Sequence, residues 1–432
     1  MALFSILCAA AAIAAAPPPP LAAAPPASNE TVNVLKFGAR PDGKTDATPA
    51  FTAAMAALKG RGGTVVVPRG AFLFKGHLNV PNGVTIAGSY ASVPAHNGVR
   101  DKGMPLPGDD GTALLATESA GNEDGAPFIT LNTNSTIKGL VIYYPNQQPD
   151  DIPQAYPWSI AMRGKNPAVL DVELLNAYNG IDASQNERHL IRNVSGQPIR
   201  RGVWIDSIYD IGRLENVHFN PWWSMQPRLY NWQMANGEAF IFGRTDWQYV
   251  FNTFCFGYKV GYRFMETKTG ATNGNFLGIG ADDCWNAVLV EQSAPMGILI
   301  TNGEFTSFHG PDPIEVKVES KHSGSVRFVN CAFWGPCNQI AKIEGRGTVG
   351  FSDCTFVQWD LQVKDGRPAI TALGGTVIIR GCEFQDNKAQ ITLGEGVKRA
   401  VITSNTFKGV QRITNGSTGT VIISENAGDP PH

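Results

Sequence analysis

The chain has 432 residues, of which 43% are apolar and 17% charged, so it is long and apolar enough to bury a large core. Its formal net charge of -2 gives no reason to expect binding to nucleic acid or to an anionic membrane surface.

The first 27 residues combine a short apolar stretch with alanine- and proline-rich sequence. The apolar run from Ala2 to Ala16 is too short for an ordinary membrane span. A-x-A triplets and a proline-rich spacer follow it, a pattern typical of a secretory signal peptide. We therefore expect residues 1–27 to be signal and spacer, the protein to be secreted or periplasmic, and no membrane insertion after signal removal. A disordered Ala/Pro tail is the alternative.

Residues from about 48 to 59 predict one helix. Asp46 or Thr48 can cap it, Pro49 suits its first turn, and its apolar residues fall on one face. A glycine-rich turn ends the helix, and the strand-like run TVVVP follows. Little further helix is expected after this point.

A repeat fills the second half of the chain. The segments VRFVNCAF, VGFSDCTF, VIIRGCEF and AVITSNTF share alternating apolar residues, a small or polar pair and a final phenylalanine, at Phe333, Phe356, Phe384 and Phe407. Short β-runs at such a period, separated by turn residues, predict the coils of a β-solenoid. Coils must stack to bury their inward residues, and an exposed end needs a cover, so we expect the early helix to cap the first coil.

Six cysteines follow Cys8, and none has the paired CxxC spacing of a zinc site. Cys331, Cys354 and Cys382 occupy equivalent positions in successive repeats, with Asn405 next in the column. We expect a buried inward column of small residues. Because stacked strands lie about 4.8 Å apart, a disulfide stays open as an alternative.

The opening NVLKFGARPDGKTDATPAFTAAMAAL, followed by GGTVVVPRGAFLF, closely resembles that of pectate-lyase-like right-handed parallel β-helix proteins, which include the family-28 glycoside hydrolases (polygalacturonases). The resemblance implies an all-β fold, a right-handed parallel β-helix with an N-terminal capping helix, over residues 32–426, with a flexible tail at 427–432. The motif specifies the fold better than the reaction, because hydrolases, lyases and phage tailspikes share it.

The turn after each Phe-ending strand collects acids, a histidine and tryptophans, in NPWW, ADDCW, SFHG and WGPC. Stacked coils would place these turns in one line on the surface. Indole faces stack on sugar rings and carboxyl groups transfer protons, so the line predicts a polysaccharide groove. Its expected substrate-binding tryptophans are Trp222, Trp223, Trp285 and Trp334.

The segment GADDCW resembles the aspartate pair of polygalacturonases, and FHG, one coil later, resembles their GHG element. The resemblance implies that Asp282 and Asp283 share the acid and water-activating roles, that His309 assists, and that the reaction inverts the anomeric centre. The family's upstream NTDG element is replaced here by ATNGN. Consecutive residues of a regular strand point to opposite faces, so the two aspartates can act together only if the turn bends. Turn capping is the alternative role for the pair.

A second group of candidate residues surrounds Asp246. This aspartate stands six residues before Asn252, as Asp210 stands six before Asn216, and the intervening chain is too long for a plain coil turn. Long loops on solenoids often wall binding sites. We therefore add Glu238 and Asp246 to the catalytic candidates, and Trp247, Arg244 and Arg263 to the substrate-binding ones, with turn capping as the alternative for Asp246 itself.

These patterns favour an exported glycoside hydrolase acting on a polysaccharide, without a metal or other cofactor. One alternative is a polysaccharide lyase on a uronate polymer, which would use Lys or Arg as base and could need Ca²⁺. The other is a non-catalytic glycan-binding or adhesin solenoid, which would keep the tryptophans without needing the acids. The sugar, the linkage and the oligomeric state are not predicted.

Overall fold

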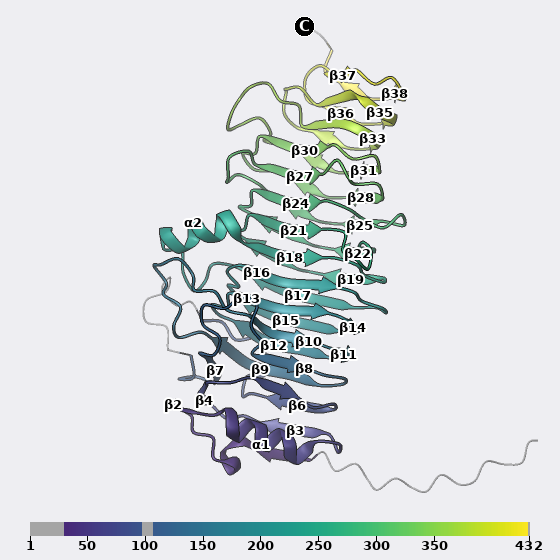
Figure 1. The fold of residues 1–432 in the computed structure, drawn as a ribbon. Helices are drawn as coiled ribbons and strands as arrows, with labels where there is room; N and C mark the ends of the chain where they lie inside the picture. Colours follow the sequence, from purple (N-terminus) through teal and green to yellow (C-terminus); the bar gives the residue numbers. More distant parts are fainter. Residues whose placement is uncertain (1–29, 97–106, 431–432) are drawn as a thin grey trace, which may run out of the picture.

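The computed structural model describes residues 30–96 and 107–430 (Figure 1). The expected signal peptide lies outside these residues. None of the helices in the described part of the chain is long and apolar enough to cross a membrane.

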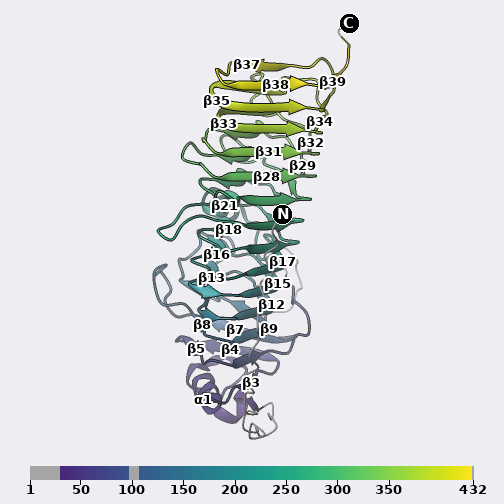
Figure 2. The same ribbon diagram turned by 90° about the vertical axis from the view of Figure 1, so that its right-hand side faces the viewer.

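The strands stack in parallel into one elongated solenoid with three faces, which confirms the predicted all-β parallel β-helix (Figures 1 and 2). The first face consists of β1 (Thr31–Asn33), β3 (Gly63–Val66), β6 (Val84–Ala87), β9 (Thr136–Tyr143), β12 (Ala168–Leu174), β15 (Leu190–Gly196), β17 (Arg213–Phe219), β19 (Gln248–Phe251), β22 (Gly274–Leu277), β25 (Ile298–Thr301), β28 (Ser325–Val329), β31 (Thr348–Ser352), the later parts of β33 (Ile370–Arg380) and β35 (Ile391–Thr403), and β38 (Thr420–Ser424).

The second face follows the first after a turn or bend. It consists of the final residues of β9, β12, β15 and β17 together with β2 (Asp42–Asp46), β4 (Gly70–Phe74), β7 (Thr112–Ala116), β20 (Phe254–Phe256), β23 (Gly280–Asp282), β26 (Glu304–Phe305), β29 (Ala332–Phe333), β32 (Thr355–Phe356), β34 (Glu383–Phe384), β36 (Thr406–Phe407) and β39 (Ala427–Gly428). Strand β39 pairs with β36, so the ladder continues two residues beyond the predicted boundary at 426.

The third face closes each coil. It consists of β5 (Leu78–Val80), β8 (Ile129–Leu131), β10 (Trp158–Met162), β13 (Asn179–Ser184), β16 (Arg201–Asp206), β18 (Glu238–Phe242), β21 (Val260–Phe264), β24 (Asn286–Val290), β27 (Ile314–Val318), β30 (Gln339–Ile343), the first parts of β33 and β35, and β37 (Ile413–Asn415). A separate short pair joins β11 (Gly164–Lys165) to β14 (Asn186–Glu187).

Helix α1 (Thr48–Leu58) lies at the N-terminal end of the solenoid, after the 3₁₀ turn η1 (Val34–Phe37) (Figure 1). Asp46 Oδ1 accepts hydrogen bonds from the Thr48 backbone N–H and hydroxyl, at 3.0 and 2.7 Å. Phe51 packs edge-on against Phe72 and Phe74 of the second face, with ring centroids 5.7 and 4.8 Å apart. The helix therefore buries the apolar face that its sequence predicted.

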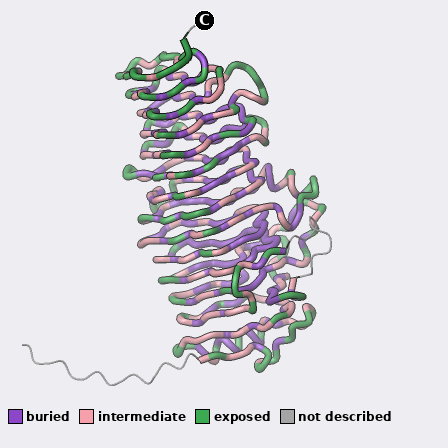
Figure 3. Tube along the Cα trace, turned by 180° about the vertical axis from the view of Figure 1, so that it is seen from behind, coloured by how far each residue is buried: buried purple, intermediate pink, exposed green. Residues whose placement is uncertain are grey.

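The interior is filled by stacked aliphatic and aromatic side chains. Buried residues alternate with exposed ones along the coils (Figure 3). The repeated phenylalanines stand side by side, with Phe333 paired to Phe305 and to Phe356 at 5.3 and 5.5 Å between ring centroids. The six cysteines from Cys255 to Cys382 are all buried and free. The cysteine positions therefore serve packing, as the repeat predicted.

A second helix, α2 (Pro227–Asn236), was not expected from the sequence. It stands out from the side of the solenoid at about the level of β21 (Figure 1). Its buried Gln233 accepts a hydrogen bond from Gln197 Nε2 at 2.9 Å and donates one to the Gly257 carbonyl at 3.0 Å. These bonds tie the helix to the corner after the second face.

Candidate active site

A hollow of about 280 Å³ opens where the first face turns into the second, over strands β20, β23 and β26. Pairing in this region sets Phe254 beside Gly280 and Gly280 beside Glu304. Asp282 lies two residues further along β23, and so on the same outer side of the sheet. Four functional side chains line the hollow: Asp282, Glu304, Thr306 and Trp334.

The carboxylate of Asp282 is held by Thr306. The threonine hydroxyl donates to Asp282 Oδ1 at 2.6 Å and accepts a hydrogen bond from the Asp283 backbone N–H at 3.2 Å. The side chain of Asp282 is half-buried, so it reaches the hollow while its orientation is fixed.

Asp283 takes a different environment from its neighbour. Its φ of +56° is left-handed and bends the chain at the end of β23. The side chain is only 4% exposed, and it accepts a hydrogen bond from the Tyr230 hydroxyl of α2 at 2.7 Å and contacts His309 Nδ1. Burial raises the pKa of Asp283, against the opposing effect of those two partners. The turn bends, which joint action of Asp282 and Asp283 would require. It nevertheless places the carboxyl of Asp282 in the hollow and buries that of Asp283.

The imidazole of His309 lies at the surface beside Asp283. Its side chain is 52% exposed, and its Nδ1 contacts the buried carboxyl of Asp283. No hydrogen-bond partner for Nε2 occurs among the described residues. A buried carboxyl on one ring nitrogen orients the imidazole and leaves the other nitrogen available for proton transfer.

Glu304 completes the hollow, although the sequence interpretation did not include it. The Trp334 indole N–H donates to Glu304 Oε1 at 2.8 Å. Since Asp282 and Glu304 are diagonal neighbours on adjacent strands, their Cα atoms lie about 8 Å apart. The signal in the sequence was the outward position just before the repeated phenylalanine, which carries an acid in GEF at Phe305.

The other predicted tryptophans divide between surface and core. Trp285 is half-buried, with the Lys259 ammonium 5.6 Å from its ring centroid, and Trp222 packs on His218 at 4.7 Å between ring centroids. Trp223 is 3% exposed and packs in a small core beside α2 with Leu229. As a correction, Trp223 cannot stack on a sugar, because the apolar side of α2 covers it.

Glu238 and Arg263 belong to an ion-pair ladder on the third face. Arg263 contacts Glu238 at 2.9 Å and Glu291 at 2.6 Å, and Lys321 contacts Glu291 at 2.7 Å. These side chains are on strands β18 and β21 and do not line the Asp282 hollow. As a correction, these two candidates neutralise each other across coils, since adjacent strands bring the opposite charges together.

Arg244, Asp246 and Trp247 lie in the turn between β18 and β19, at the far end of the first face from Asp282. The Arg244 guanidinium bonds the Ile208 carbonyl and lies 4.5 Å from the Tyr209 ring centroid. Asp246 and Trp247 line a separate hollow. The structure therefore does not bring these three candidates to the Asp282 hollow, because the whole first face intervenes.

No group of three or more His, Cys, Asp or Glu side chains within residues 30–96 and 107–430 is arranged to hold a metal ion. The groups that can do chemistry at the hollow are two carboxylates, a hydroxyl and an indole donor, and the imidazole of His309 lies beside Asp283, the sequence neighbour of Asp282. Such a set can transfer protons to and from a bound polar substrate.

Residues 31–163 match a family model described as rhamnogalacturonase A/epimerase, pectate lyase-like, which confirms the resemblance of the N-terminal region. No curated protein matches the chain in sequence. The N-terminal fragment of gene product 12 from bacteriophage phi29 shares the fold with a TM-score of 0.66 at 14% identity, covering 92% of this chain and 70% of that one. The catalytic unit of a thermostable α-1,3-glucanase from Streptomyces thermodiastaticus gives 0.50 at 14% identity, with 93% and 72% covered. At these identities the structural likeness concerns the fold alone.

Proposed function

We propose that this protein is an exported polysaccharide-active glycoside hydrolase in which Asp282 and Glu304 form the acid/base pair. The observation that carries the proposal is that both carboxylates open onto one surface hollow beside the half-exposed indole of Trp334. One carboxyl would protonate the leaving oxygen while the other activates water.

The spacing of the two acids favours inversion. Their Cα atoms, about 8 Å apart, allow the carboxyl groups to stand at the roughly 6.5–9.5 Å that inverting glycosidases need, which is wider than the roughly 5–5.5 Å of retaining ones. Room for a water molecule between acid and base is the physical reason for the longer spacing. We infer that the reaction releases the inverted anomer.

Asp283 and His309 would support this pair rather than replace it. The buried carboxyl orients the imidazole, whose exposed Nε2 can bind a sugar hydroxyl or shuttle a proton at the rim. The description of the family model that matches residues 31–163 supports a carbohydrate as the substrate class.

The test is a digest of a polysaccharide panel, containing polygalacturonate, rhamnogalacturonan and α-1,3-glucan, by the mature protein. Reducing ends and the ultraviolet absorbance of unsaturated products are read together. We expect reducing ends without absorbance, and a loss of about 10²- to 10⁴-fold in turnover for Asp282→Asn and for Glu304→Gln.

Glu383→Gln is the matched control, because Glu383 lies further along the same outer row of the second face and does not line the hollow. It should leave turnover unchanged. Unsaturated products would show that the protein is a lyase and not a hydrolase. Glycan binding without any turnover would indicate a binding protein, and full activity in both hollow variants would move the site elsewhere.

A further inference from the structure

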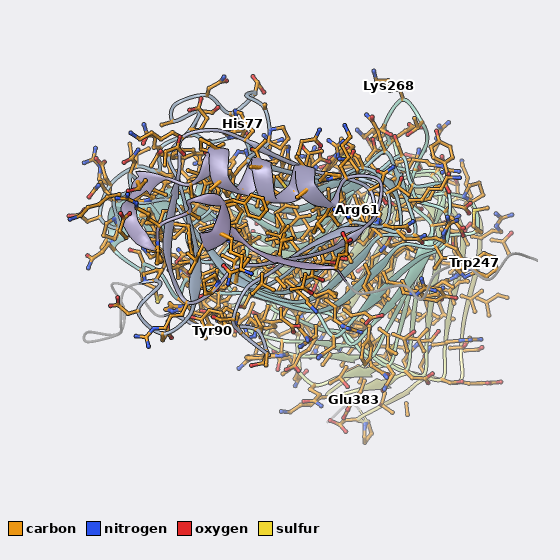
Figure 4. The ribbon with its side chains drawn as sticks, turned by 90° about the horizontal axis from the view of Figure 1, so that it is seen from below. Arg61, His77, Tyr90, Trp247, Lys268 and Glu383 are labelled. Atoms are coloured by element: carbon orange, nitrogen blue, oxygen red, sulfur yellow. The ribbon has the colours of Figure 1, made fainter. Side chains whose placement is uncertain are left out.

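A second hollow, of about 650 Å³, lies at the start of the first-face strands β19, β22 and β25. Viewed along the solenoid from its N-terminal end, Trp247 projects from a different side of the molecule than Tyr90 and Glu383, which mark the second face (Figure 4). The two hollows therefore cannot hold the same sugar unit. We call the second one the Trp247 hollow.

Its lining combines exposed apolar side chains with polar ones. Trp247 is 59% exposed, Met296 68% and Tyr249 40%. The polar members are Asp246 and Asn275, together with the amide of Asn273. A concave site of about 300–1,000 Å³ with aromatic walls and a few polar groups is the usual form of a small-ligand site.

The backbone of Trp247 is held in an unfavourable conformation that keeps its ring in solvent. Its φ of +58° is left-handed, which is rare for a bulky residue, and its N–H donates to Asn273 Oδ1 at 2.5 Å. Leaving a large indole exposed on a strained residue costs stability. Such a cost is typical of functional sites.

Two polar groups of the hollow are not used by the fold. Neither the carboxylate of Asp246 nor the amide of Asn275 forms a hydrogen bond or ion pair within the described part of the chain. Asp210, which occupies the equivalent position one coil earlier, is by contrast paired with Arg188 at 2.5 Å. Asp246 thus remains available to a ligand where its counterpart serves the fold.

We propose that the Trp247 hollow is a second carbohydrate-binding site, separate from the Asp282 hollow, that takes a neutral pyranose unit of a polysaccharide. The C–H face of the ring would stack on Trp247, as apolar surfaces do on indole, and the hydroxyls would donate to the Asp246 carboxylate. No cationic residue is among those that line the hollow, so Asp246 would repel a uronate carboxylate.

The apolar surface around the hollow is better matched to a sugar than to a second protein chain. Exposed apolar side chains continue along the first face at Phe251, Leu277, Leu299 and Val329. They cover four coils and two columns, which is roughly 300 Å² at a strand spacing of about 4.8 Å. A stable protein interface needs about 800 Å² from each partner.

The test uses 5-fluorotryptophan protein, in which the nine tryptophans give separate ¹⁹F signals and Trp247→Gly identifies the signal of Trp247. The probes are cellohexaose, laminarihexaose and mannohexaose, with hexagalacturonate as the acidic comparison, all added to the Asp282→Asn variant so that turnover cannot consume them. We expect at least one neutral probe to shift the Trp247 signal, and hexagalacturonate to leave it in place.

Calorimetry then measures the same probe on three variants. Trp247→Gly should remove the binding event or weaken it about tenfold, since it removes the stacking surface. Its melting temperature should not fall, because glycine accepts the left-handed backbone. Asp246→Asn should weaken the event too, whereas Ile152→Ala, which removes an equally exposed apolar side chain outside the hollow, should not.

The proposal is overturned if no neutral probe moves the Trp247 signal. It is also overturned if light scattering shows the protein to be an oligomer that Trp247→Gly dissociates, because the hollow would then face another copy. Neither outcome depends on turnover, so failure here is distinct from failure of the hydrolase proposal.

Discussion

Two coils of the second face carry a glutamate at the same position, Glu173 and Glu304, and one is buried while the other is exposed. Strand pairing places Glu173 in the same outer row as Ser195, His218, Phe254, Gly280 and finally Glu304. Glu173 has no exposed surface, whereas Glu304 is exposed at a hollow. Position in the coil therefore determines which way an acid points, and the covering chain determines whether it can meet a ligand.

The cover over Glu173 comes from the chain on either side of the undescribed residues 97–106. His96 donates its backbone N–H to Glu173 at 2.7 Å, and its ring lies between Glu173, 2.5 Å away, and Asp110, 3.1 Å away. Tyr90 donates to Asp110 at 2.6 Å. We call this group the covered cluster.

Charge holds the covered cluster together. Burial by itself lowers the pKa of His96, but the hydrogen bond and charge of Glu173, with help from Asp110, outweigh it and raise that pKa to about 9. Burial raises the pKa of Glu173, against the opposing effect of the hydrogen bonds and charge of His96.

The largest effect should come from breaking the contact between His96 and Glu173. His96→Ala leaves the Glu173 carboxyl buried without its partner, and should lower the free energy of unfolding by about 3–5 kcal/mol. Glu304→Ala, at the exposed acid of the Asp282 hollow, should change the free energy of unfolding by less than about 0.5 kcal/mol. Urea unfolding measures both, with the exposed His77→Ala as the histidine control. Equal losses at positions 96 and 304 would contradict the contrast between the two coils.

The pH dependence of stability gives the next largest effect. The folded pKa of His96, about 9, lies above the ordinary value of 6.5, so the protonated form stabilises the fold. That contribution is complete below about pH 6.5 and is lost as the pH rises through 9, a decrease of about 3 kcal/mol. The free energy of unfolding should therefore fall from pH 6 to 9.5 in the wild type. It should fall much less in His96→Ala. Parallel curves would show that His96 is not the titrating group.

The smallest effect concerns the contact between α2 and Asp283, at the end of β23. Tyr230→Phe leaves the buried Asp283 with one donor fewer, and should cost about 1–2 kcal/mol, because a buried charged acceptor loses a hydrogen bond. Amide exchange should become faster in 227–236, since that bond anchors the helix. Tyr209→Phe, at a tyrosine 59% exposed, should change neither quantity. Unchanged exchange in α2 would mean that other contacts, such as those of Gln233, hold the helix.

The sequence was enough to predict the architecture. The phenylalanine repeat and the buried cysteine column are local patterns with a regular spacing, and a solenoid repeats the same local contacts coil after coil. Stacking in register then follows from the repeat, so Phe333 and Phe356 meet as their spacing predicted.

The composition of the sites depended on the tertiary structure. Neighbouring coils decide that Glu238 meets Arg263 and that Glu304 joins Asp282 at the hollow. The covering helix α2 decides that Trp223 is buried. Those segments interrupt the repeat, so no period in the sequence predicts where they pack. The coil sets the direction of each side chain, and the non-repeating chain decides which of them remain open to solvent.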